Sequence, residues 1–194
     1  MLEALLSSTA VVALAEIGDK TMLLAIVLAA RLRAPWPIVG GILMATIANH
    51  TLAALLGSEV AGLLEATWFR IAVALGFIAM AAWTLVPDTL EDGEAAAAVR
   101  QRGGAFLTTL VSFFIVEMGD KTQVATIALG AHYHAVIAVA AGTTLGMMLV
   151  NAPSVFLGDR LMQVVSLKLA RTVAALLFLV LGLWQLARAL GWTG

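Results

Sequence analysis

The chain has 194 residues, of which 62% are hydrophobic and only 12% charged, and its mean hydropathy is +1.02. Soluble domains carry about 25% charged residues, so this composition indicates an integral membrane protein. The net charge of −1 and the absence of cysteine argue against a basic nucleic-acid-binding surface and exclude disulfides, thiolate metal sites and cysteine nucleophiles.

Six apolar stretches are long enough to cross a hydrocarbon core of about 30 Å. They lack the two-residue alternation of a membrane barrel, so each is expected to be a helix. The predicted fold class is therefore all-α, with six transmembrane helices. The predicted spans are residues 4–30, 36–58, 68–86, 105–131, 135–157 and 170–190.

The basic residues between these spans predict the orientation of the chain. Seven lie in or beside the loops after spans one, three and five, whereas only Arg70 and Arg188 lie on the opposite side. By the positive-inside rule, those three loops are cytoplasmic and both termini lie outside the cytoplasm. The seven are Arg31, Arg33, Arg100, Arg102, Arg160, Lys168 and Arg171.

A shift of 101 residues aligns the two halves of the chain without a gap. It places EIGDKT (16–21) on EMGDKT (117–122), and it matches residues in the other two spans of each half, such as Gly41 with Gly142. Because each half has three spans, the second half is expected to enter the membrane in the opposite sense, as an inverted-topology repeat. The predicted organisation is a first three-helix repeat (1–87), a cytoplasmic linker (88–104) and a second three-helix repeat (105–194).

Each copy of the motif places three charges near the middle of an apolar span. Glu16 and Glu117 each lie 12 residues after the start of their spans, about 18 Å along a helix. The spacing within each motif predicts that Glu, Asp and Lys share one helix face. The glycine between the two acids allows either the close approach of another backbone or a local loosening of the helix.

The six motif charges are expected to face the interior of the protein. Facing lipid, they would cost about 15–20 kcal/mol, at roughly 2.5–3.5 kcal/mol each. A purely structural ion-pair network is the less favoured interpretation, because buried ion pairs are a poor source of stability and this arrangement occurs twice at equal depth.

The charges of the two motifs do not balance. Four ionised carboxylates carry −4 and two lysines return +2, so the remaining −2 matches one divalent cation or two protons. This balance leads to the hypothesis of cation/proton exchange, although burial could instead keep one acid protonated or a lysine neutral. Carboxylates without sulfur suit Mn²⁺ and Ca²⁺, whereas copper and structural zinc fit poorly. The predicted metal ligands are Glu16, Asp19, Glu117 and Asp120.

Neighbouring polar residues are the predicted supporting residues of the site. The two lysines set the charge balance, and each threonine could add a ligand, cap a broken helix or bond back to its own helix. His50 falls opposite Asn151 in the gap-free alignment, and either completes the coordination shell or ties helices together; an imidazole there would favour Mn²⁺ over Ca²⁺. The supporting set is Lys20, Thr21, Asn49, His50, Lys121, Thr122, Gln123 and Asn151, with Met22 in the first motif where the second has Gln123.

The duplicated Glu-x-Gly-Asp-Lys-Thr motif resembles that of the transmembrane protein 165 family of cation/proton exchangers, whose bacterial members include manganese exporters of the MneA type. The resemblance covers essentially the whole chain. It implies that the motif acids carry the cation and the protons, and that the protein lies in the inner membrane of a prokaryote. Met22 departs from the glutamine that many members have after the threonine, which puts a ligand at that position in doubt.

The leading hypothesis is a secondary transporter that exports Mn²⁺ in exchange for protons by alternating access between the two repeats. The alternatives are a Ca²⁺/H⁺ antiporter, a divalent-cation channel and an amino-acid exporter of the lysine-exporter type. An enzyme is not expected, because the sequence has no HExxH motif, no Ser/His pair at useful spacing and no soluble catalytic domain. The expected partners are the transported ion and the lipid bilayer, without a resident cofactor; the sequence indicates no oligomeric state.

Overall fold

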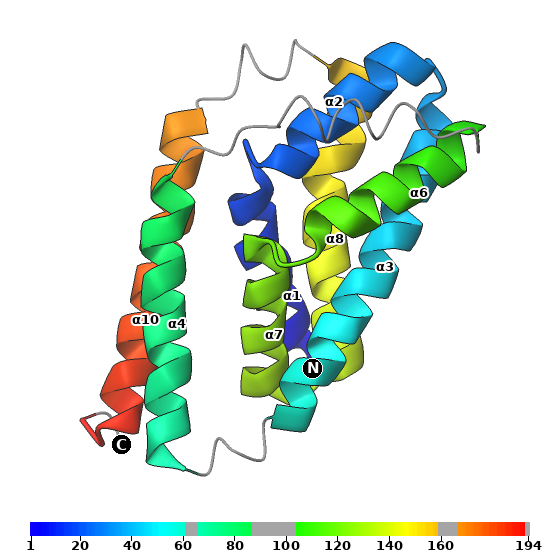
Figure 1. The fold of residues 1–194 in the computed structure, drawn as a ribbon. Helices are drawn as coiled ribbons and strands as arrows, with labels where there is room; N and C mark the ends of the chain where they lie inside the picture. Colours follow the sequence, from blue (N-terminus) through cyan, green and yellow to red (C-terminus); the bar gives the residue numbers. More distant parts are fainter. Residues whose placement is uncertain (61–65, 87–103, 159–166, 193–194) are drawn as a thin grey trace.

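A computed structural model describes residues 1–60, 66–86, 104–158 and 167–192, and these residues form eight α-helices and no strand (Figure 1). The prediction of an all-α protein is therefore confirmed. The helices are α1 (Leu2–Glu16), α2 (Lys20–Leu32), α3 (Pro35–Val60), α4 (Thr67–Leu85), α6 (Gly104–Glu117), α7 (Lys121–Tyr133), α8 (Val136–Leu157) and α10 (Leu167–Ala189).

Four of the described helices are long and apolar enough to cross a membrane. They are Pro35–Val60, Thr67–Leu85, Val136–Leu157 and Arg171–Ala189. At about 1.5 Å per residue, even the 19-residue examples reach nearly 30 Å. These helices coincide with four of the six predicted spans, and they fit a membrane protein.

The two remaining predicted spans are not continuous helices. Each is broken inside the motif, so that α1 gives way to α2 and α6 gives way to α7. Gly18 and Gly119 have φ angles of 81° and 78°, in the left-handed region that glycine adopts at little cost. The prediction that Glu, Asp and Lys share one helix face is therefore wrong, because the glutamate ends one helix and the lysine begins the next.

The aspartate of each motif starts the second helix of its pair. The side chain of Asp19 accepts a hydrogen bond from the backbone N–H of Thr21 at 3.5 Å, and Asp120 accepts one from Thr122 at 3.4 Å. This is the N-cap arrangement, which satisfies a backbone donor that has no partner within its own helix. The same aspartate-capped helix break thus occurs in both halves.

The helices of the two halves interlock. α3 packs on α6 and α7, α8 packs on α1 and α2, and α4 and α10 pack chiefly on each other. In Figure 1 the α4–α10 pair stands at one flank with its helices running in opposite directions, and both chain ends lie toward the same end of the bundle. The predicted linker lies outside the described residues except for Gly104, where α6 begins.

Glycines allow α3 and α8 to approach their neighbours closely. A Cβ atom at Gly57 would lie 2.2 Å from the carbonyl oxygen of Ile127 in α7, and one at Gly142 would lie 2.5 Å from that of Leu5 in α1. Contact through small residues is a common basis of helix packing in membranes. The two crossings bring α7 to α3 and α1 to α8.

Gly57→Ala is expected to lower the thermal unfolding midpoint of the purified protein in detergent, because the added methyl group overlaps the backbone of α7. Overpacking of this kind costs about 1–3 kcal/mol. Gly76→Ala in α4 is the matched control, since its Cβ would meet nothing within 4 Å and alanine favours a helix by up to about 1 kcal/mol. Equal midpoints for the two variants would show that the α3–α7 contact is not tight.

Candidate cation-binding site

The two broken helices bring their motif acids into the interior of the bundle. The exposed fraction is 0% for Glu16, 1% for Asp19, 1% for Glu117 and 3% for Asp120. Buried carboxylates are stable only when they are paired, hydrogen-bonded, protonated or bound to a cation. The partners of each acid therefore indicate what the site can do.

Each lysine pairs with the aspartate of the other motif. Lys121 Nζ lies 3.2 Å from Asp19 Oδ1, and Lys20 Nζ lies 3.5 Å from Asp120 Oδ1. The two ion pairs cross between the halves of the chain and hold the two helix breaks against each other. They also neutralise both aspartates, since one lysine serves each.

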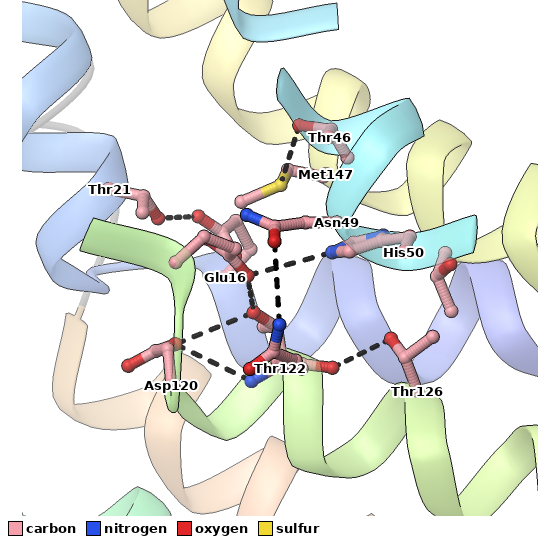
Figure 2. A network of polar contacts seen from close by, with 12 residues as sticks. Glu16, Thr21, Thr46, Asn49, His50, Asp120, Thr122, Thr126 and Met147 are labelled. Carbon is pink, nitrogen blue, oxygen red and sulfur yellow. Dashed lines mark hydrogen bonds and ion pairs between the residues drawn. The ribbon is translucent and has the colours of Figure 1, made fainter. Parts of the chain in front are cut away.

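The glutamates are held in a different way. Glu16 Oε1 accepts a hydrogen bond from the Thr21 hydroxyl of its own motif (Figure 2). It also accepts one, at 2.9 Å, from Asn151 Nδ2 on α8. Glu117 Oε1 accepts one from the Thr122 hydroxyl and lies 3.6 Å from His50 Nε2 on α3.

Residues 50 and 151 are related by the same 101-residue shift as the motifs. The structure places each of them beside the glutamate of the opposite half, so that the relation between the halves extends from the motif to its neighbours. The two surroundings differ chemically, because one glutamate receives an amide N–H and the other faces an imidazole.

Three oxygens at this site have no hydrogen-bond donor among the described residues. They are Glu16 Oε2, Glu117 Oε2 and Asn151 Oδ1, and all three atoms are buried. The two glutamates are also close enough to interact electrostatically. Buried oxygens without donors are costly, and a hard cation prefers oxygen ligands of this kind, so this donor set suits a divalent ion or protons.

The described part of the chain contains no group of three or more His, Cys, Asp or Glu side chains arranged to hold a metal ion. Among the described carboxylates, Glu16 interacts electrostatically with both Glu117 and Asp120, and each aspartate is also paired with a lysine. A cation bound between the glutamates would therefore complete its shell with amide, hydroxyl or backbone oxygens.

Asn49 and Gln123 support the second helix break. Asn49 Nδ2 donates to the carbonyl of Phe114 at 3.0 Å, and Asn49 Oδ1 accepts from Gln123 Nε2 at 3.4 Å. Gln123 Oε1 accepts from the N–H of Gly119 at 2.7 Å, while Met22 Sδ receives that of Gly18 at 3.3 Å. The glycine N–H at the helix break therefore donates to a thioether sulfur in the first motif and to an amide oxygen in the second.

Thr46 and Met147 form a contact that the sequence analysis missed. The Thr46 hydroxyl donates to Met147 Sδ at 3.1 Å and joins α3 to α8 next to the glutamates (Figure 2). Both side chains are buried. The signal was available, since positions 46 and 147 are 101 residues apart, but a threonine and a methionine do not look alike in an alignment.

The family model for the divalent cation/proton antiporter GDT1 matches this chain twice, over residues 4–92 and 105–192. This chain belongs to the GDT1 family. The resemblance to a family of cation/proton exchangers is thereby confirmed, and the family is one of cation transporters.

Relatives of this GDT1 protein cover most of its length. A Vibrio cholerae protein named "Putative manganese exporter" is 47% identical over 177 residues, which are 91% of this chain and 86% of that protein. GDT1-like protein 3 of Arabidopsis thaliana is 30% identical, covering 91% and 68%, and GDT1-like protein sll0615 of Synechocystis is 29% identical, covering 92% and 94%. No solved structure gives a significant match.

Proposed function

We propose that this protein is a secondary transporter that exports Mn²⁺ in exchange for protons. The crossed ion pairs carry the proposal, because they assign the unbalanced charge to particular residues. Asp19 with Lys121 and Asp120 with Lys20 sum to zero, so that the remaining −2 belongs to Glu16 and Glu117. One divalent cation or two protons neutralises that pair.

Glu16 and Glu117 are the proposed ligands, through their donor-free oxygens, together with Asn151 Oδ1. Asp19 and Asp120, which the sequence also predicts as ligands, act in this arrangement as lysine partners and helix caps. The last carbonyls of α1 and α6 add oxygens at the breaks, as unwound helices do in other transporters. Thr21 and Thr122 orient the two glutamates.

The proposed topology is six spans in two inverted three-helix repeats. The broken pairs α1–α2 and α6–α7 serve as spans one and four, and the family model matches once in each half. The distribution of Lys and Arg supports cytoplasmic loops after spans one, three and five, with both termini outside the cytoplasm of a prokaryotic cell. Access alternates as one repeat moves against the other.

Manganese is the proposed substrate for two reasons. The Vibrio relative is named as a manganese exporter, and His50 lies beside Glu117, where imidazole nitrogen favours Mn²⁺ over Ca²⁺. Carboxylate and amide oxygens also suit Ca²⁺, so both ions belong in the test.

Purified protein in liposomes is expected to take up Mn²⁺ faster when a pH gradient drives protons outward, and to alkalinise the lumen as it does so. The measurement follows Mn²⁺ and Ca²⁺ in parallel, with and without the gradient, and protein-free liposomes are the control. Uptake that ignores the pH gradient would favour a channel. Faster Ca²⁺ than Mn²⁺ exchange would make Ca²⁺ the main substrate.

A further inference from the structure

Two adjoining cavities are lined by residues of the α4–α10 pair and of α7, and the first also by residues of α1. The first, of about 180 Å³, is enclosed by α1, α4, α7 and α10, and its walls are mainly apolar, with Val11, Phe77 and Leu129 among them. The second, of about 210 Å³, shares His132 and Gln185 with the first. Neither contains a residue of the two motifs.

Arginines line the second cavity. Arg70 lies in the first turn of α4 and Arg188 in the last turn of α10, and both contribute to its wall. They are the two basic residues that the span assignment places on this side of the membrane. Neither guanidinium forms an ion pair with a described carboxylate. The Arg188 guanidinium instead stacks on the Trp184 ring at 5.3 Å, which restricts its orientation.

The junction between the two cavities is a fixed polar contact. Gln185 on α10 is hydrogen-bonded to the His132 ring on α7, and that ring also packs edge-on against Trp184. The cavity lined by the two arginines therefore lies on one side of this contact, and the apolar cavity lies on the other. The arrangement has the polarity of a phospholipid, with a phosphate position at helix ends and a chain position between helices.

We propose that this is a phospholipid-binding site, in which Arg70 and Arg188 hold the phosphate and one acyl chain enters the apolar cavity. Guanidinium groups bind phosphate through charge-assisted hydrogen bonds, and tryptophan and arginine near helix ends lie at headgroup level. An anionic headgroup is preferred to a zwitterionic one, because a headgroup amine would lie beside two arginines. Neither cavity suits a divalent cation, because the walls of the first are mainly apolar and the second is lined by two positively charged arginines.

The bound lipid would connect two parts of the molecule. α4 and α10 pack chiefly on each other and contact α1 and α7 less extensively, and the apolar cavity lies between this pair and α1 and α7. An acyl chain in that space adds contacts to both sides, so that the lipid stabilises the docking of the α4–α10 pair on the helices that carry the motifs.

Native mass spectrometry of the full-length protein in detergent tests the proposal with phosphatidylglycerol and phosphatidylcholine of identical chains. The wild type is expected to bind phosphatidylglycerol more tightly. Arg70→Gln/Arg188→Gln should weaken this binding at least about tenfold, since each lost charged hydrogen bond contributes about that factor. Arg31→Gln/Arg33→Gln is the matched control, because it removes two exposed arginines at the C-terminal end of α2, which does not line either cavity. This variant should bind phosphatidylglycerol as the wild type does.

Two further measurements separate a lipid from a free anion. Glycerol phosphate at the same concentration should not displace phosphatidylglycerol, because it cannot fill the cavity. Ala10→Trp, which places an indole into the cavity, should lose lipid binding while both arginines remain. Equal binding of the two lipids by the wild type, unchanged binding in the double arginine variant, or displacement by glycerol phosphate would each overturn the proposal.

Discussion

Glu16→Gln and Glu117→Gln are each expected to reduce Mn²⁺/H⁺ exchange at least about 100-fold, beyond the loss typical of residues that only support a metal ligand. Glutamine keeps the shape of the side chain and can still accept the threonine hydrogen bond. It can neither carry the negative charge that a divalent cation needs nor take up the exchanged proton. The measurement is the initial rate of Mn²⁺ uptake into liposomes under a fixed pH gradient.

Glu59→Gln is the matched control for both variants. Glu59 lies near the end of α3 and is exposed, so the same change of charge there should leave the rate unaltered. Size-exclusion elution of all three variants shows whether they remain folded. Near-normal exchange in both glutamate variants would place the site elsewhere in the molecule.

Lys121→Met is expected to destabilise the protein strongly, because it leaves the buried carboxylate of Asp19 without its cation. Breaking one side of a buried ion pair costs roughly 3–5 kcal/mol. Adding Asp19→Asn removes the unpaired charge and should recover most of that loss. The measurement is the thermal unfolding midpoint in detergent for the two single variants and the double variant.

The matched control is the double variant Asp19→Asn/Lys20→Met, which changes an aspartate and a lysine of one motif. The crossed arrangement predicts no recovery there, because Lys121 loses its ion pair with Asp19 and Asp120 loses its ion pair with Lys20. If this variant recovers stability as well as Asp19→Asn/Lys121→Met does, the lysines are not paired across the two halves.

The sequence predicts most of the architecture because burial and repetition leave direct marks on it. Four of the predicted spans coincide with long apolar helices. The gap-free shift pairs His50 with Asn151, and the structure places each beside the glutamate of the other half. Both inferences rest on composition and spacing, which do not depend on local backbone geometry.

The helix breaks could not be predicted with the same certainty. Apolar residues continue on both sides of each motif, so hydropathy alone reads residues 4–30 as one span. The glycine and the aspartate are compatible with either a loosened helix or a break. Capping of α2 and α7 by Asp19 and Asp120 favours the break. The two aspartates are also held by the lysines of the opposite motif, which are tertiary contacts that the sequence pattern does not contain.

The identity of each lysine's partner was also beyond the sequence. Glu and Lys are four residues apart in each motif, which in a continuous helix indicates a pair within the motif. The breaks at Gly18 and Gly119 redirect the lysines instead, so that each reaches the aspartate of the opposite motif. The charge count is unaffected, because it does not depend on which groups pair.

The number of protons exchanged for each Mn²⁺ tests the central claim most directly. In liposomes with known Mn²⁺ and pH gradients, the condition of zero net Mn²⁺ flux gives this number. A glutamate pair that binds either one divalent cation or two protons predicts zero flux when the Mn²⁺ ratio equals the square of the proton ratio, whatever membrane potential is imposed. A zero-flux condition that follows the membrane potential and ignores the pH gradient would contradict the account.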